Sequence, residues 1–183
     1  MTILLDRAFA STRGVLAQVR AEHLDAPTPC ASWDLRALVE HFVGSARWAA
    51  AMIGGAAPAE YTVDDLDFLA AYDESRKLAL EAFGAEGALD RTVMLPFGEL
   101  TGVGLLALAT NDQFTHGWDL ARALGLPTDL DPELATEALA QARIGISEAY
   151  RGPDGVGLFG PVVEPPAGAS AADRLAAFLG RAV

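Results

Sequence analysis

The chain has little of several residue types, and each shortage excludes a class of protein. Cysteine occurs once among 183 residues, as Cys30, which rules out an internal disulfide and suits a reducing compartment. Lysine and arginine number 13 against 25 acidic residues, so the net charge is −12. A surface this acidic repels nucleic acid and anionic membranes. We therefore expect neither as a partner.

Long hydrophobic runs are also missing, although 51% of the residues are hydrophobic. No apolar stretch approaches the length that spans a bilayer. The first seven residues, MTILLDR, lack the basic region, apolar core and cleavage site of a signal peptide. No repeat or long linker divides the chain, and its length suffices for one well-packed core. We expect a single cytoplasmic domain over residues 1–183.

Apolar residues recur at helical spacing along most of the chain, between breaks rich in proline and glycine. Two prolines within 25–30 end the first helix, and Gly54 with Gly55 ends the second. Ser32 is a candidate N-cap for the second helix, with Asp34 in its first turn. Helices are predicted at about 4–23, 33–53, 63–83, 104–123, 132–150 and 169–179.

Residues 91–100 differ from the rest and favour a short extended pair or hairpin, in which Pro96 argues against central strand pairing. Antiparallel packing of the helices around one core accounts best for the whole pattern. The predicted fold is all-α: an antiparallel four-helix bundle with a hairpin segment and extra C-terminal helices. An exposed apolar helix face would also support a homodimer.

Asp112 and His116 lie four residues apart in the helix expected at 104–123. Both fall within its apolar stripe, where a carboxylate is costly unless it is paired. Side chains one turn apart, about 6 Å along the axis, can point at one bound cation. We favour a metal site, and the alternative is a buried pair that neutralises itself. The stripe consists of Leu105, Leu108, Ala109, Leu120 and Ala123.

A metal held by these two side chains needs another protein ligand, and His41 is the candidate. It lies on the flank of the apolar stripe of the second helix, where a neighbouring helix can reach it. Such a histidine is more often a hydrogen-bonded structural residue, and an Asp-x-x-x-His spacing is common by chance. Two imidazoles and one carboxylate, with an open position, are typical of a catalytic metal site rather than a closed structural one.

Three stretches carry a family resemblance: TPCASWDLRALVEH at 28–41, DQFTHGWDLARALG at 112–125 and DRLAAFLGR at 173–181. The first two each place a histidine near a Trp-Asp pair. The chain resembles the DinB-like superfamily, specifically the N-terminal domain of mycothiol-dependent maleylpyruvate isomerase and its short actinobacterial relatives. The resemblance implies a four-helix bundle with His41, Asp112 and His116 as metal ligands. The isomerase has Glu at the position of Asp112, which implies a different reach and metal preference here.

The resemblance also implies a chemistry. A divalent cation, most simply zinc, with nickel, iron and manganese as further candidates, would hold a low-molecular-weight thiol of the mycothiol type as its thiolate. The thiolate would then attack a small electrophile. The isomerase has an additional C-terminal domain that contributes to its active site, and 183 residues leave no room for it. The resemblance therefore does not extend to maleylpyruvate isomerisation itself. We expect a metal-dependent thiol transferase or an isomerase-like enzyme; the alternatives are a non-catalytic metal or small-ligand binding domain and a metal-stabilised structural bundle.

Other residues are assigned supporting or structural roles. Asp34, Ser45 and Asp119 are candidates for orienting a ligand imidazole through its other nitrogen. Cys30 precedes a helix start, a position that can lower a thiol pKa, but loop packing is its expected role. His23, at a helix C-terminus, is expected at the surface. Packing is expected of Trp33, Trp48 and Trp118, and an anion-binding arginine could be Arg36, Arg47, Arg122 or Arg143.

Overall fold

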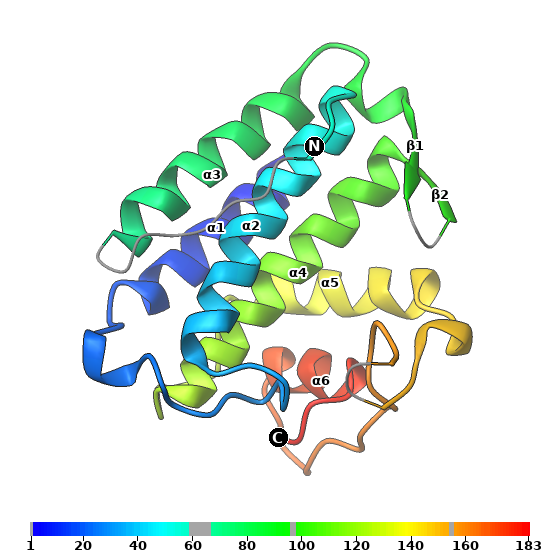
Figure 1. Ribbon diagram of the computed structural model, residues 1–183. Coiled ribbons are helices and arrows are strands. Elements are labelled where there is room, and N and C mark those ends of the chain that lie inside the picture. Colours follow the sequence, from blue (N-terminus) through cyan, green and yellow to red (C-terminus); the bar gives the residue numbers. More distant parts are fainter. Residues whose placement is uncertain (1, 59–66, 96–97, 154–155) are drawn as a thin grey trace.

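Six α-helices, one β-hairpin and three short 3-10 helices are the regular elements of the part of the chain that the structure describes (Figure 1). The structure is a computed structural model, and it describes residues 2–58, 67–95, 98–153 and 156–183. The mostly helical fold with a short hairpin is confirmed. The elements are α1 (Ile3–Leu16), α2 (Leu35–Gly54), α3 (Phe68–Gly84), β1 (Thr92–Leu95), β2 (Gly98–Thr101), α4 (Gly102–Ala123), α5 (Pro132–Gly145) and α6 (Ala171–Phe178).

Side-chain caps explain where several helices begin. Asp34 caps α2, because its carboxylate accepts the backbone N–H of Ala37, and the prediction that Ser32 is the N-cap is wrong. Asp67 caps α3 in the same way. Part of the predicted start of α3, residues 63–66, lies outside the described residues. Thr101, Asp131 and Ser170 cap α4, α5 and α6.

Two helices are shorter than predicted. The first ends at Leu16 rather than at residue 23, because the next N–H groups form tighter bonds to carbonyls three residues back and Arg20 is extended. The chain then turns so that Leu24 O accepts the N–H of Arg36 at the start of α2. The fifth helix ends at Gly145 rather than at residue 150, because the next residue is extended and a separate 3-10 turn follows.

The predicted hairpin is confirmed, and it lies at the N-terminal end of α4. Strands β1 and β2 are antiparallel, with Thr92 opposite Thr101 and Leu95 opposite Gly98. Pro96 lies outside the described residues. Val93 and Leu95 point into the core, which anchors the hairpin to the helices. No helix among the described residues combines the length and the apolar content that crossing a membrane requires.

Helix α4 is the centre of the molecule. Helix α1 packs against α3 and α4, and α2 packs against the same two helices. Helices α5 and α6 pack against each other and against α4, and Figure 1 shows them lying across the other helices. Residues 113–121 of α4 are consequently all buried, on every face of the helix. The predicted single apolar stripe describes only the side of α4 that faces α1 and α2.

Two clusters of buried hydrophobic residues lie on either side of α4. The first, here the N-terminal core, joins α1, α2, α3, the hairpin and α4. The second, the C-terminal core, joins α5 and α6 to Phe114 and Trp118 of α4 and to Ala8 of α1. Gly117 lets α1 lie close to α4, because a Cβ there would come within 3.0 Å of Thr12 Cβ and closer still to its hydroxyl.

Candidate metal centre

His41, Asp112 and His116 lie close together between α2 and α4. The Oδ1 atom of Asp112 lies 3.3 Å from His41 Nε2 and 3.4 Å from His116 Nε2. One ligand atom from each residue lies within 4.8 Å of the other two. The helical spacing brings Asp112 and His116 together, and the packing of α2 on α4 adds His41. These three residues are called the His–Asp–His cluster below.

The Asp112 carboxylate is oriented by neutral donors on its other oxygen. Ser45 Oγ donates a hydrogen bond of 2.6 Å to Oδ2, and the Gln113 amide lies 3.4 Å from the same atom. Gln113 is itself fixed, since its amide donates to Phe42 O and its carbonyl accepts from the Tyr72 hydroxyl. The Oδ1 atom is therefore left facing the two imidazoles. Ser45 thus orients the carboxylate rather than an imidazole.

The donor set and its spacing fit a divalent cation. Zinc takes nitrogen and oxygen ligands at about 2.0–2.1 Å in a tetrahedron, whose ligands are then about 3.3–3.4 Å apart. The distances from Asp112 Oδ1 to His41 Nε2 and His116 Nε2, 3.3 and 3.4 Å, match that spacing. The side chains of His41 and Asp112 are 34% and 23% exposed, so the cluster is open to solvent on one side. An open side is what an exchangeable ligand requires.

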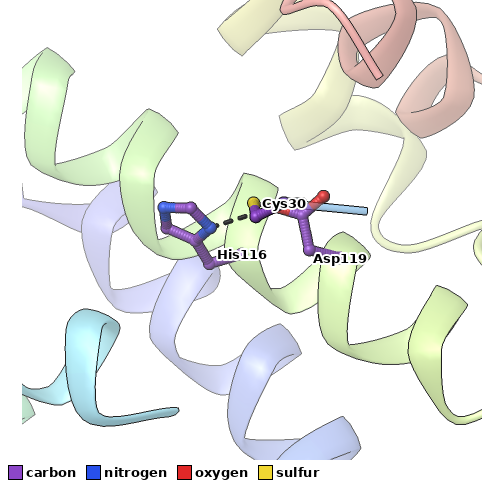
Figure 2. Close-up of side chains that lie close together, drawn as sticks. All are labelled: Cys30, His116 and Asp119. Atoms are coloured by element: carbon purple, nitrogen blue, oxygen red, sulfur yellow. Dashed lines mark hydrogen bonds and ion pairs between the residues drawn. The ribbon is translucent and has the colours of Figure 1, made fainter. Parts of the chain in front are cut away.

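The other ring nitrogen of His116, Nδ1, faces a second set of residues. Nδ1 lies 3.0 Å from Asp119 Oδ2, so Asp119 contacts the His116 imidazole as predicted. Figure 2 shows the Cys30 thiol and the Asp119 carboxylate together on this side of the His116 ring. Cys30 Sγ donates to Asp119 Oδ2 over 3.4 Å. Cys30, His116 and Asp119 are also close enough to hold a cation.

Arg181 binds the same carboxylate from the C-terminal segment. Its Nε lies 3.2 Å from Asp119 Oδ1 and one terminal nitrogen lies 3.0 Å from Oδ2, so the pair is bidentate. The same guanidinium lies 3.6 Å from Cys30 Sγ. A cation at the Cys30 side would have to compete with this guanidinium for Asp119. The His–Asp–His cluster is therefore the better metal site of the two.

The electrostatics of the cluster favour positive charge. Burial would raise the pKa of Asp112, but the charge and hydrogen bond of His116, aided by His41, hold this pKa far below its usual range. Burial would lower the pKa of His116, but Asp112 and Asp119 hold it well above its usual value. The pKa of Asp119 falls to about 2, because Arg181 and His116 outweigh its burial. Without a metal, a proton on His116 neutralises part of the carboxylate charge.

Three residues of the site were not predicted as functional. Cys30 was expected only to pack in a loop, yet it contacts Asp119. Trp33 was expected only to pack, and it does pack against the N-terminal core, but its ring centroid also lies 4.3 Å from that of His41 and 5.6 Å from that of His116. Arg181 was not considered at all. The signal available was the motif context, since all three lie in the stretches that carry the family resemblance.

Other predicted residues lie elsewhere. The Asp34 carboxylate caps α2 and is exposed, so its prediction as an imidazole partner is wrong. His23 is half-buried in a 3-10 turn, where its Nδ1 accepts the N–H of Arg20. Arg47 binds Ser75 and Glu74, and Arg143 lies over the Phe178 ring. The guanidinium that binds Asp119, beside the cluster, is that of Arg181, which was not among the four arginines considered.

Comparisons with known proteins agree with this architecture. Two relatives, uncharacterized protein Rv0738 of Mycobacterium tuberculosis strain H37Rv and uncharacterized protein MT0763 of strain CDC 1551, are each 42% identical over 181 residues, 97% of this chain and 95% of the relative. No solved structure was found to match. The family described as "Mycothiol maleylpyruvate isomerase N-terminal domain" matches residues 5–121, which include the whole His–Asp–His cluster. The chain therefore belongs to this family of DinB-like domains.

Proposed function

We propose that the chain is a single DinB-like domain that binds a divalent cation through His41, Asp112 and His116. A cation bound there would supply the charge that keeps a low-molecular-weight thiol as its thiolate, for transfer to a small electrophile. The observation that carries the proposal is the meeting of both Nε2 atoms at Asp112 Oδ1, on a solvent-open side of the molecule. Zinc is the expected cation because two imidazoles and one carboxylate suit it. The family name supports mycothiol as the thiol.

The antiparallel four-helix bundle is part of the same proposal. Its support is that α1 and α2 each pack against both α3 and α4, the pairing expected around a four-helix core. The ligands in such a fold project inward from facing helices, as His41 of α2 and Asp112 of α4 do. Helices α5 and α6 are then an additional layer on the outside of α4.

The residues of the cluster have separate tasks in this mechanism. A bound divalent cation supplies positive charge that lowers the pKa of a thiol from about 8.5. Asp119 accepts the Nδ1–H of His116, which leaves the Nε2 lone pair for the cation. Ser45 keeps Asp112 Oδ1 turned toward the imidazoles. The Trp33 ring covers the two imidazoles from one side.

The transfer itself is a nucleophilic substitution. The thiolate sulfur attacks the electrophilic carbon, one S–C bond forms, and the leaving group departs with the electrons of its bond to carbon. The thiol proton goes to solvent. The protein contributes orientation and a stabilised thiolate, since near neutral pH a free thiol is mostly protonated.

Cation binding should depend on pH in a defined direction. The pKa of His116 is well above its ordinary value in the metal-free protein, so a cation must displace a proton from this residue. We expect the apparent affinity for zinc to rise with pH and proton release to accompany binding at pH 7. Isothermal titration in two buffers of different ionisation enthalpy measures the released protons.

The decisive experiment is elemental analysis of protein purified without chelator or affinity metal. We expect about one divalent metal per chain in the wild type and none in His41→Ala or His116→Ala. His23→Ala is the matched control, because this histidine lies away from the cluster and should leave metal content unchanged. A folded wild type that stays empty after incubation with zinc, nickel or manganese would refute the proposal.

Catalysis is tested next on the metal-loaded protein. The assay uses mycothiol with 1-chloro-2,4-dinitrobenzene, in which chloride is the leaving group. We expect the metal-loaded wild type to catalyse this reaction. Removal of the metal should abolish the activity, and His41→Ala should lack it. Metal binding without turnover, with this and other electrophiles, would leave the non-catalytic metal-binding domain as the function.

A further inference from the structure

Arg181 of the C-terminal segment contacts Asp119, close to His116, although the two residues lie 62 positions apart in the chain. Its guanidinium forms two hydrogen bonds to Asp119, at 3.2 and 3.0 Å. The Asp119 side chain is fully buried and that of Arg181 is 14% exposed. Because this ion pair is buried and bidentate, its two side chains keep one relative orientation. A surface ion pair, in contrast, can adopt several.

Asp119 links Arg181 to the proposed metal ligand. Its Oδ2 atom lies 3.0 Å from His116 Nδ1 and 3.0 Å from the Arg181 guanidinium. A carboxylate held only by one imidazole could rotate about its bond to Cβ. The bidentate guanidinium fixes the plane of the carboxylate, and the carboxylate then fixes the plane of the imidazole.

The backbone delivers Arg181 to this position by a close crossing. Gly180 has φ of 96°, and a Cβ there would lie 2.7 Å from the carbonyl carbon of Gly160. Arg151 supports the crossing, because its guanidinium donates to Gly160 O and Phe178 O, each at 2.9 Å. Gly180, the residue before Arg181, therefore cannot move away from Gly160 without breaking this close contact.

We propose that Arg181 is a positioning residue of the metal centre: it acts through Asp119 to fix the orientation of His116 and so strengthens cation binding. The inference rests on the proposed function. The residues matched by the family end at 121, so this role would give the C-terminal segment a direct part in the site. The layer formed by α5 and α6 would then help to position a residue of the metal centre as well as cover α4.

The test is a double-mutant cycle on the cobalt and zinc dissociation constants, measured by competition with a chelator. Arg181→Gln should bind either metal about tenfold more weakly, and Arg181→Lys should recover part of the loss. Asp119→Asn should also weaken binding. Arg181→Gln should add nothing in the Asp119→Asn background, because both changes break one chain of contacts.

The matched control is Arg174→Gln. Arg174 is an exposed arginine of α6 that binds Ala169 O and not the cluster, so its removal should leave the dissociation constants unchanged. The cobalt absorption bands, which report ligand geometry, should shift in Arg181→Gln and not in Arg174→Gln. A role limited to folding would lower the melting temperature without moving these bands.

The outcomes separate the two proposals. A wild type that binds neither metal refutes the proposed function. A wild type that binds both, with Arg181→Gln binding equally well, overturns the positioning role alone. Additive effects in the cycle also overturn it. If Arg181→Gln does not fold, Arg181→Lys carries the test, since weaker binding with a shifted cobalt spectrum is expected and wild-type values contradict the inference.

Discussion

The two sides of α4 are built from different side chains. The N-terminal core is filled mainly by leucine, phenylalanine and valine, whereas alanine supplies about half of the buried hydrophobic residues of the C-terminal core. Short side chains let helices approach closely, and larger ones hold them further apart. The alanines of the C-terminal core are Ala8, Ala135, Ala138, Ala142, Ala171, Ala172 and Ala176.

The buried polar groups are distributed just as unevenly. Gln113, Tyr72 and Thr12 form hydrogen bonds on the side of α4 that faces α1, α2 and α3. On the other side, Trp118 Nε1 and Thr128 Oγ1 both donate to the Asp173 carboxylate of α6. The difference indicates a division of tasks: one side holds the polar site, and the other packs α5 and α6 closely enough to bring the C-terminal segment to Asp119.

The largest effect is expected from emptying the N-terminal core. Phe42 is fully buried and its ring lies 5.4 Å from that of Tyr72. Phe42→Ala should lower the free energy of unfolding by about 3–5 kcal/mol. Leu175→Ala in the C-terminal core should cost less, about 2–3 kcal/mol, because the short helix α6 can move to fill the space. Urea denaturation followed by circular dichroism measures both, and an equal or larger cost at Leu175 would contradict the comparison.

Closing the gap between α1 and α4 should be the next most damaging change. Gly117→Ala would place a methyl group against Thr12, whose hydroxyl binds Gln113 O at 2.7 Å. We expect a loss of about 1–3 kcal/mol. Gly44→Ala is the matched control in α2, where nothing lies within 4 Å of the added Cβ, and it should stabilise the protein by about 0.5–1 kcal/mol. Stabilisation by both substitutions would show that the close approach at Gly117 is dispensable.

A pH-dependent effect should arise on the C-terminal side. Burial would raise the pKa of Asp173, but hydrogen bonds from Trp118 and Thr128 lower it. A lowered pKa stabilises the fold above the unfolded value of about 3.9, and the stabilisation is lost as pH falls through the folded value. Asp173→Asn should therefore cost about 1–2 kcal/mol at pH 7. The difference from wild type should shrink below pH 4 in denaturation curves, and a constant difference would contradict this assignment.

The smallest effect is expected from a surface link between the two sides. Arg7 of α1 binds Asp131 at the start of α5, and both side chains are partly exposed. Arg7→Gln should lower the melting temperature slightly at low salt and not at high salt, because exposed ion pairs are screened. Arg20→Gln, which removes a local pair with Glu22, serves as the control and should have no effect at either salt concentration. A salt-independent loss in Arg7→Gln would indicate packing rather than charge.

Sequence reasoning recovered the local features of the fold. The prediction that Gly54 with Gly55 ends the second helix is confirmed, and the predicted ends of the third and fourth helices lie within one residue of the observed ends. The errors are local as well. Ser32 and Asp34 are both good capping residues, and the bond to Ala37 decides between them. The first helix stops at Leu16 because the following turn returns the chain to α2, a contact that local preference does not encode.

The site was recovered in part for the same reason. Asp112 and His116 share one helix face through their spacing, and His41 followed from the resemblance and from the scarcity of histidine. Cys30 and Arg181 could not be placed in this way, because their contacts with Asp119 join residues 89 and 62 positions apart. A long-range contact depends on which helices pack together and on where each loop crosses.

The amino-acid sequence by itself determined the helical periodicity, most helix ends, the hairpin and the pairing of Asp112 with His116. All of these depend on residues within a few positions of one another. Only the tertiary structure decided that α4 is buried on both sides, that His41 faces Asp112, and that Arg181 reaches Asp119. The physical reason is that packing between distant segments depends on the shape of whole surfaces, and no local pattern contains that information.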